Sequence, residues 1–346
     1  MKLSLFDYDL PRELIAQYPT RHRDQSRLLV LDRSTGELVH SRFSDIVNYL
    51  RPGDALVVNN TKVFKARLFG KRATGGKVEL FLVRPTDDNP AEAWEALAYP
   101  SRRLKEGEII SFPDTGQVVL EADLTGGRWR VLFSSRTARE RIISRHGHVP
   151  LPKYVNRDVV PMDVRRYQTV FSREEKTGAV AAPTAGFHFT RNLLNRIAAK
   201  GVSVCEITLH VGPGTFKPIK TAAIEDHLID QEYAELSESV AATLNRARRE
   251  GGRIFAVGTT SVRTLESTRI VNNQIQPLAE MVNLYIKPGH EFHLVDHLIT
   301  NFHIPKSSLL VLVSAFTGRE KILETYAEAV GREYRFYSYG DAMLIL

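Results

Sequence analysis

The chain has 346 residues, of which 43% are hydrophobic and 25% are charged. These fractions exclude a disordered, collagen-like or coiled-coil chain, and the length favours two domains. The single cysteine, Cys205, excludes an internal disulfide and a cysteine-based zinc or iron–sulfur site. No apolar run reaches the ~18 residues of a membrane helix, and Asp7 and Asp9 interrupt any signal-peptide core. We therefore expect a soluble, cytoplasmic protein.

The net charge of +7 is concentrated in about a quarter of the chain. Residues 61–155 carry 17 basic and 11 acidic side chains, whereas residues 1–60 carry 8 of each and residues 156–346 carry 22 and 21. One cluster contains no acid at all: Lys62, Lys65, Arg67, Lys71, Arg72 and Lys77. An arginine-rich cluster follows within residues 128–145. Such clusters form either a solvated face or a footprint for nucleic-acid phosphates, and both interpretations stay open.

The first part of the chain predicts two strands followed by a β-rich segment. The apolar runs at 28–33 and 55–60 are expected to be strands. Residues 61–133 contain short β-type runs separated by Gly-, Asp- and Pro-rich turns, at 62–70, 77–83, 93–99, 108–112, 117–123 and 128–133. This pattern is typical of a small barrel or sandwich. An amphipathic stretch at 138–147 precedes a Pro-bounded segment at 149–155.

The second part alternates between helix and strand. Helices are predicted at 193–201, 237–252, 262–270 and 319–334, and extended or buried segments at 202–211, 253–258, 281–289, 307–316 and 334–346. Such alternation indicates an α/β core. The sequence therefore predicts a larger α/β domain, residues 1–60 plus 156–346, with a small all-β, barrel-like basic domain inserted at 61–155.

Several common site motifs are missing. There is no G-x-G-x-x-G after a strand, no Walker loop and no H-E-x-x-H. His290, His293 and His297 lie close together in sequence, but Pro288 and Gly289 favour a loop over the helix that an i, i+4 metal pair needs. We therefore predict no metal site.

Loops rich in glycine and hydroxyl groups are the candidate sites. In GAVAAPTAGFHFT (178–190), small residues around Thr184 and Gly186 allow close approach of a ligand, and His188 lies between two aromatic residues. A strand ending at His210 turns through Gly212 and Gly214. Ligands of α/β proteins bind beyond the carboxyl ends of strands. Further candidates follow later strands: Thr260, Ser261 and Arg263, then Asn301, then Tyr337, Tyr339 and Asp341.

Several long sequence segments resemble motifs of the S-adenosylmethionine:tRNA ribosyltransferase-isomerase family. They include YQTVF (167–171), APTAGFHFT, LHVGPGTFKP, VGTTSVRTLES, TNFHIPKSSLLVLVSAF and YRFYSYGDAML, and LFDYDLPRELIAQYP and GHVPLPKYV nearer the N-terminus. The resemblance covers essentially the whole chain. Its departures are Phe187 in place of Leu, Asn283 in place of Asp, and Asp230-Gln231-Glu232 where the family has a Met-His-x-Glu form.

The resemblance implies an enzyme that uses S-adenosylmethionine as a ribosyl donor. Such enzymes build epoxyqueuosine on 7-aminomethyl-7-deazaguanine at the wobble position of tRNA and release adenine and methionine. The family fold is an α/β domain with an inserted β-barrel. The implied partners are tRNA and S-adenosylmethionine, the latter a co-substrate, and no cofactor is expected. No feature indicates an obligate protein partner, so we expect a monomer.

Residue roles follow as hypotheses. His188 and His210 are the candidates for general base and general acid, because histidine titrates near neutral pH. Aromatic residues around Tyr337 and Tyr339 are candidates to face the sulfonium. The acid-free lysine and arginine cluster is expected to contact tRNA phosphates. The candidates for holding adenosine hydroxyls and the methionine carboxylate are Arg166, Tyr167, Gln168, Thr184, Thr260 and Ser261.

Two rival interpretations come from other functional classes. The chain could be an RNA-binding module whose loops are structural, or an ordinary methyltransferase. The missing glycine fingerprint disfavours the methyltransferase. The products formed from S-adenosylmethionine and tRNA discriminate among the three.

Overall fold

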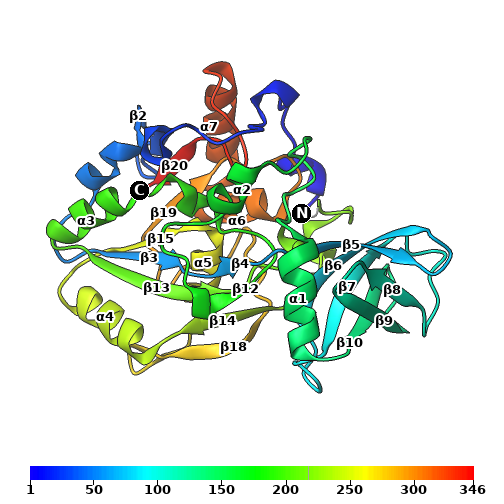
Figure 1. Ribbon diagram of the computed structural model, residues 1–346. Coiled ribbons are helices and arrows are strands. Elements are labelled where there is room, and N and C mark those ends of the chain that lie inside the picture. The colour runs from blue at the N-terminus through cyan, green and yellow to red at the C-terminus, as the bar shows by residue number, and fades with distance from the viewer. Residues whose placement is uncertain (217) are drawn as a thin grey trace.

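The computed structural model describes residues 1–216 and 218–346, so Lys217 of the predicted loop lies outside the described residues. Its elements form an α/β body and a smaller β-rich body beside it (Figure 1). This confirms the predicted fold class. Within the described residues, no helix is long and apolar enough to cross a bilayer.

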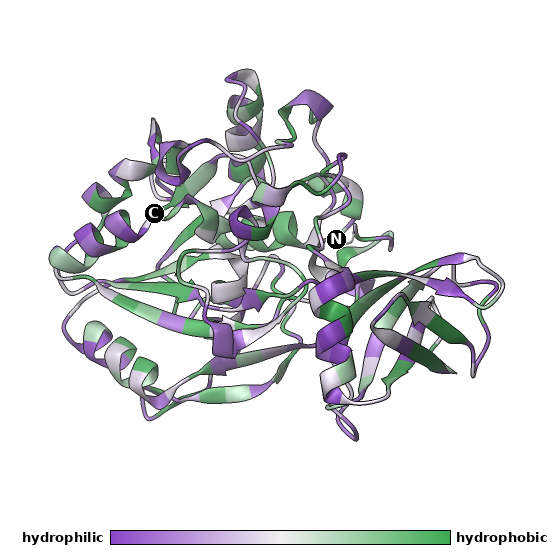
Figure 2. Ribbon diagram, in the orientation of Figure 1, coloured by the Kyte–Doolittle hydropathy of each residue, from purple (hydrophilic) through white to green (hydrophobic). Residues whose placement is uncertain are grey.

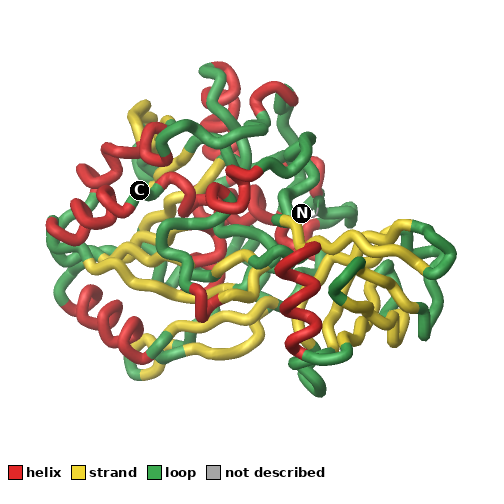
Figure 3. The backbone as a smooth tube through the Cα atoms, in the orientation of Figure 1, coloured by secondary structure: helices red, strands yellow, loops and turns green. Residues whose placement is uncertain are grey.

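A nine-stranded mixed sheet forms the centre of the α/β body, as far as the described residues show (Figure 3). Its central strands β13, β3, β15 and β19 are parallel. Their carboxyl ends therefore meet at one edge, where the loops predicted to hold ligands begin. The order across the sheet is β18 (Leu278–Val282), β14 (Glu232–Leu236), β13 (Ser203–Leu209), β3 (Ala55–Asn59), β15 (Ile254–Val257), β19 (His297–Asn301), β20 (Ala342–Ile345), β1 (Arg27–Leu31) and β2 (Leu38–Arg42).

Both faces of this sheet are covered by helices. Alternate residues of β3 point to opposite faces: Ala55 and Val57 pack in one hydrophobic cluster, and Leu56 and Val58 in another. The first cluster contains residues of α4 (Glu238–Arg249), α5 (Gly258–Glu266), α6 (Ser308–Thr317) and α7 (Arg319–Gly331). The second contains residues of α3 (Arg191–Ala199) and the 3-10 helix η4 (Phe43–Tyr49). A strand buried on both faces reads as a continuous apolar run.

Six antiparallel strands close into a barrel, because β8 also pairs with β5. Its core includes the buried Trp129 and Phe133, and hydrophobic residues run through its strands whereas α1 is largely hydrophilic (Figure 2). The order is β5 (Arg67–Arg72), β6 (Lys77–Pro85), β7 (Ala93–Tyr99), β10 (Arg128–Phe133), β9 (Gly116–Asp123) and β8 (Ile109–Phe112), with the short β11 (Gly147–His148) added beside β5 and α1 (Arg136–His146) before it.

Short elements complete the fold. Two small sheets pair β4 (Lys62–Val63) with β12 (Thr177–Ala179), and β16 (Ile270–Val271) with β17 (Gln274–Ile275). Helix α2 spans Pro161–Arg166. The 3-10 helices besides η4 are η1 (Leu3–Phe6), η2 (Arg12–Leu14), η3 (Arg23–Gln25), η5 (Glu174–Lys176), η6 (Thr184–His188), η7 (Pro213–Phe216) and η8 (Ile224–Asp226).

Three predicted elements differ from the structure. The strand expected at 62–70 is divided into β4 and β5, because β4 pairs with β12 and not within the barrel. Helix α5 begins directly at Gly258, whose φ of 84° lets β15 turn into the helix without a cap. The closing strand expected at 334–346 is reduced to β20, since Tyr337 has a φ of 72°, which extended backbone does not allow.

Candidate active site

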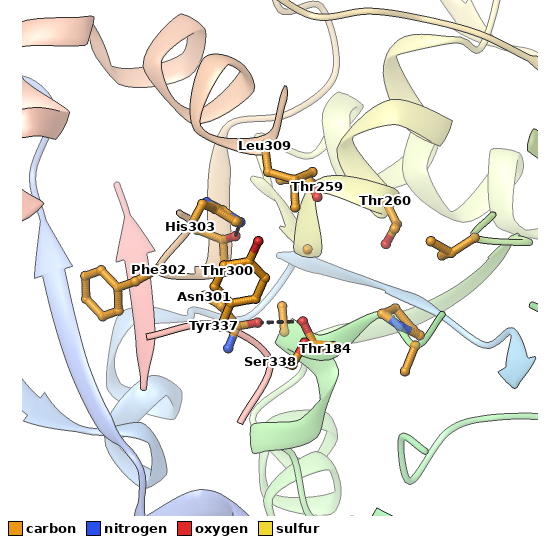
Figure 4. A pocket seen from close by; sticks show the side chains of 15 residues that line it. Thr184, Thr259, Thr260, Thr300, Asn301, Phe302, His303, Leu309, Tyr337 and Ser338 are labelled. Carbon is orange, nitrogen blue, oxygen red and sulfur yellow. Dashed lines mark hydrogen bonds between the residues drawn. The ribbon is translucent and has the colours of Figure 1, made fainter. Parts of the chain in front are cut away.

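A cavity of about 460 Å³, which we call the nucleoside-sized cavity, lies at the carboxyl ends of β13, β15 and β19. Its wall includes the residues that follow these strands, together with Thr184 of η6 and Tyr337 (Figure 4). This is the edge of a parallel sheet where ligands usually bind.

The wall of this cavity combines apolar residues with uncharged polar ones, and none of its described residues carries a charged side chain. It presents an amide from Asn301, an imidazole from His303 and the hydroxyl groups of Thr184, Thr259, Thr260, Thr300, Tyr337 and Ser338. Burial lowers the pKa of His303 to about 3, so its ring is neutral at pH 7. Such a wall suits a neutral ligand with several donors and acceptors.

A chain of buried hydrogen bonds fixes the orientation of Thr184. Its hydroxyl donates to Asn301 Oδ1 (3.1 Å), and Asn301 Nδ2 donates to His188 Nε2 (3.0 Å). His188 Nδ1 then donates to Ser26 Oγ (2.7 Å), which donates to the carbonyl of Arg23 (3.4 Å). Because the Thr184 proton is used on Asn301, the hydroxyl offers acceptor lone pairs for any other contact.

A second cavity, of about 590 Å³, adjoins the first, since Leu309 lines both. We call it the charged cavity. Arg263 from α5 lies in its wall, 5% exposed, and its Nη1 donates to Glu232 Oε2. Glu232 Oε1 also accepts from the amide of Gly212 (2.7 Å). Its polar wall also includes His227, Asp230, Tyr285 and Ser308.

Comparison with known sequences identifies the family. The family model described as "Queuosine biosynthesis protein" matches residues 3–345. A protein of Syntrophomonas wolfei named S-adenosylmethionine:tRNA ribosyltransferase-isomerase is 49% identical, with 100% of this chain and 97% of that protein aligned. A protein of Desulforamulus reducens with the same name is 45% identical over 100% of both chains. The chain belongs to the queuosine biosynthesis protein family. It is a transferase.

A solved structure supports membership of the queuosine biosynthesis protein family. The crystal structure of the S-adenosylmethionine tRNA ribosyltransferase from Thermotoga maritima is 35% identical to this chain. The match covers 99% of this chain and 100% of that one, with a TM-score of 0.57. The family resemblance inferred from the sequence segments is thereby confirmed.

Some of the predicted site residues line one of the two cavities, and the others lie in the structure around them. Thr184, Thr260, Asn301 and Tyr337 line the nucleoside-sized cavity. Gly214 and Arg263 line the charged cavity. Residues more than 150 positions apart are thus brought to one edge of the sheet.

Neither predicted catalytic histidine is among the residues that line these two cavities. His188 is buried behind the wall, with both ring nitrogens bonded to Ser26 and Asn301, and burial lowers its pKa to about 3. His210 Nδ1 bonds to Thr61 Oγ1 (2.8 Å), and burial lowers its pKa to about 4. In this geometry both rings hydrogen-bond to neighbouring side chains, and their catalytic role stays a prediction.

The remaining predicted residues hold the surrounding chain. Gln168 bonds to both backbone groups of Val63 and so fixes β4. The Tyr339 hydroxyl donates to Asp163 (3.0 Å), away from either cavity wall. Five other predicted residues form hydrogen bonds within the protein: Arg166 with the carbonyls of Thr20 and Arg21, Tyr167 with the Ala182 amide, Gly212 with Glu232, Ser261 with the Val257 carbonyl, and Asp341 with Arg27 and Arg335. Gly186 is needed for close packing, because a Cβ there would lie 2.5 Å from Phe171.

Several residues of the two walls were not among the predicted ones. His303 lies two positions after Asn301, so the same polar loop supplied the signal. Thr259 precedes the predicted Thr260. Glu232 is the glutamate of the Met-His-x-Glu form that this chain keeps, but no role was assigned to it, because its partner Arg263 comes from a distant helix. Tyr285 carries no local signal.

Buried neutral histidines predict acid sensitivity of the fold. Burial lowers the pKa of His188 and His303 to about 3 and of His210 and His297 to about 4, against 6.5 in the unfolded chain. The unfolded state therefore binds more protons below about pH 6.5, and stability falls as pH drops from there towards 3. We expect the urea midpoint to decrease between pH 7.5 and pH 5. A midpoint independent of pH in this window would contradict the burial of these rings.

Proposed function

We propose that this enzyme transfers and isomerises the ribosyl part of S-adenosylmethionine onto 7-aminomethyl-7-deazaguanine at the wobble position of tRNA. The products are epoxyqueuosine in the tRNA, free adenine and free methionine. The observation that carries the proposal is the pair of adjoining cavities at one sheet edge, one neutral and hydroxyl-lined, the other charged. The names of the full-length relatives support both substrates.

The chemistry begins at the carbon beside the sulfonium. A base removes a C5′ proton, which the positive sulfur acidifies. The ribose ring opens and adenine leaves with a proton from an acid. The amine of the deazaguanine attacks the opened sugar, and closure to the epoxide expels methionine. The sulfonium is cationic, so a neutral cavity wall avoids the repulsion that a protonated histidine would cause.

The protein's contribution is to orient the substrate in this cavity. We assign His188 to positioning, because it bonds the Asn301 amide that fixes Thr184. His303 is the imidazole at the cavity wall, and its ring nitrogens lie within hydrogen-bond distance of Thr300 Oγ1 (3.3 Å) and the Tyr326 hydroxyl (3.2 Å). His210 acts through Thr61 and the neighbouring strand end.

Product analysis tests the proposal directly. The protein is incubated with S-adenosylmethionine and tRNA that carries 7-aminomethyl-7-deazaguanine, and the small molecules are quantified. Adenine and methionine in equal amounts are expected. S-adenosylhomocysteine would indicate methyl transfer, and absence of turnover with retained tRNA binding would indicate a binding module. Either result would overturn the proposed function.

The tRNA footprint proposed for the basic cluster is narrower than its six residues. Lys62 pairs with Glu174, Arg67 with Glu79 and Arg72 with Glu108. Lys65 lies between β4 and the barrel. Lys71 and Lys77 are exposed and directly opposite each other on β5 and β6. Two like charges in that position repel each other, so an anion between them would stabilise the strand pair.

Replacing Lys71 with alanine is expected to weaken tRNA binding and to change the salt slope by about 0.9, because one phosphate contact is lost. The slope of log K against log salt concentration measures this. Arg332→Ala, which removes an exposed cation from the far side of α7, is the matched control and should leave the slope unchanged. Equal slopes for the wild type and Lys71→Ala would exclude Lys71 from the footprint.

A further inference from the structure

Arg263, in the wall of the charged cavity, has a hydrogen-bond donor without a partner. Its Nη1 bonds to Glu232 and its Nε to the carbonyl of Leu284 (3.3 Å). Its Nη2 is buried and has no hydrogen-bond partner. A buried guanidinium N–H without an acceptor costs free energy. A ligand that supplies an acceptor would satisfy this N–H.

Two further donors line the same cavity. The hydroxyl of Tyr285 is buried without a partner, and burial raises the pKa of Tyr285 to about 12, so it keeps its proton. Ser308 and Leu309, in the first turn of the ten-residue helix α6, also lie in the wall. Ser307 caps this helix by accepting from Leu310 N (3.2 Å). The amides of Ser308 and Leu309 have no partner within the helix, and this end favours negative charge.

Carboxylates stand on another part of the wall. Glu232 pairs with Arg263, and Asp230 accepts two bonds of 3.0 Å from Arg128 of the barrel. Arg128 also donates to Glu95, so its guanidinium is shared between two carboxylates. Carboxylate oxygens accept strong hydrogen bonds from an ammonium group, so this part of the wall suits a cationic group. The donors around Arg263 and the nearby carboxylates suit the two ends of an α-amino acid.

The two cavities are adjacent. Leu309 belongs to both walls. Thr260 and Arg263 are three positions apart on α5, which places them on one helix face, and they line the nucleoside-sized and charged cavities respectively.

We propose that the charged cavity binds the α-amino-acid group of S-adenosylmethionine, with its carboxylate on Arg263 and its ammonium towards Glu232 and Asp230. The sulfonium then lies at the junction beside Leu309, and the nucleoside occupies the neutral cavity. The inference rests on the proposed function, because it assigns one group of that co-substrate.

The test pairs a change in the ligand with a change in the protein. Dissociation constants are measured for S-adenosylmethionine and for its decarboxylated analogue, which lacks only the α-carboxylate. The wild type is expected to prefer S-adenosylmethionine by about 10- to 100-fold, the range for a charge-assisted hydrogen bond. In Arg263→Met/Glu232→Gln the preference should fall to about one.

Each variant has a defined purpose. The paired variant avoids leaving one buried charge unmatched, and the new glutamine can still accept from Gly212. Arg263→Lys keeps the charge and removes the second N–H, so it should show reduced preference if the paired variant does not fold. Arg173→Met/Glu206→Gln removes an Arg–Glu pair that lines neither cavity, and it should keep the full preference.

The outcomes separate the inference from the proposed function. Full preference for the carboxylate in Arg263→Lys or in the paired variant would overturn the inference while adenine and methionine release stands. No preference in the wild type would do the same. If the wild type binds no S-adenosylmethionine and releases no adenine, the proposed function fails and the inference with it.

Discussion

Replacing Asn301 with alanine is expected to lower kcat/KM for S-adenosylmethionine roughly 100-fold, since hydrogen bonds of ~1–3 kcal/mol are lost from a buried network. Asn301 is 4% exposed and connects Thr184 of the cavity wall to His188 behind it. Without the amide, the Thr184 hydroxyl is free to rotate and no longer presents a fixed acceptor. The rate of adenine release at saturating tRNA measures the effect.

Asn245→Ala is the matched control for this prediction. Asn245 is also buried, and it makes two hydrogen bonds with the backbone of Ile275 (3.0 and 2.8 Å), but it lines neither cavity. Its loss should reduce stability and leave kcat/KM nearly unchanged. If the two variants have the same kinetics, the network through Asn301 does not orient substrate.

Replacing Asp163 with alanine is expected to lower the free energy of unfolding by about 3–5 kcal/mol, the range for removing one partner of a buried ion pair. Asp163 is fully buried and accepts two bonds from Arg157 (2.7 and 2.8 Å). The Val160 amide (2.9 Å) and the Tyr339 hydroxyl (3.0 Å) also donate to it. The variant leaves all of these donors without an acceptor. Urea unfolding at pH 7 gives the change.

The surface residue Asp32 provides the control for Asp163. It also accepts several short-range bonds, from the amide and hydroxyl of Ser34 (2.8 and 2.6 Å) and from the Thr35 amide (3.2 Å). Water replaces these bonds when the side chain is removed. Asp32→Ala should therefore destabilise far less than Asp163→Ala. Similar losses in both variants would show that burial of the Arg157–Asp163 pair does not matter for stability.

We expect acid to reduce the stabilisation by Asp163 in a lower pH range than the one in which the buried histidines destabilise the fold. Burial alone would raise the pKa of Asp163, but hydrogen bonds from Arg157 and the Val160 amide outweigh it and hold the pKa below 3.8. Its stabilisation is therefore complete above about pH 4 and is lost as pH falls through the folded-state pKa. The loss expected between pH 6.5 and pH 4 belongs to the buried histidines.

Local patterns in the sequence were sufficient to predict the fold class. Strands β3 and β15 are buried on both faces, so nearly all of their residues are apolar and form continuous apolar runs in the sequence. Helix α4 begins at the predicted Ser237 cap and ends just before Gly251, whose φ is 75°. These are local effects of capping and burial, which sequence alone expresses.

The role of individual site residues depended on contacts that no local pattern contains. His188 is four positions after Thr184 of the cavity wall, but its two ring nitrogens are hydrogen-bonded to Ser26 and Asn301, which lie far apart in the chain. The aromatic segment around Tyr337 was predicted as a strand, but a left-handed residue interrupts it. Three of the six residues of the basic cluster form ion pairs with acidic residues in the folded structure, for example Arg72 with Glu108.

In the proposed reaction, the ribosyl group of S-adenosylmethionine becomes part of tRNA. The most direct measurement uses S-adenosylmethionine labelled with ¹³C in the ribose, incubated with the enzyme and tRNA carrying 7-aminomethyl-7-deazaguanine. The tRNA is digested to nucleosides and analysed by mass spectrometry. We predict that all five labelled carbons appear in the modified wobble nucleoside. An unlabelled wobble nucleoside, or label found only in S-adenosylhomocysteine, would contradict the account.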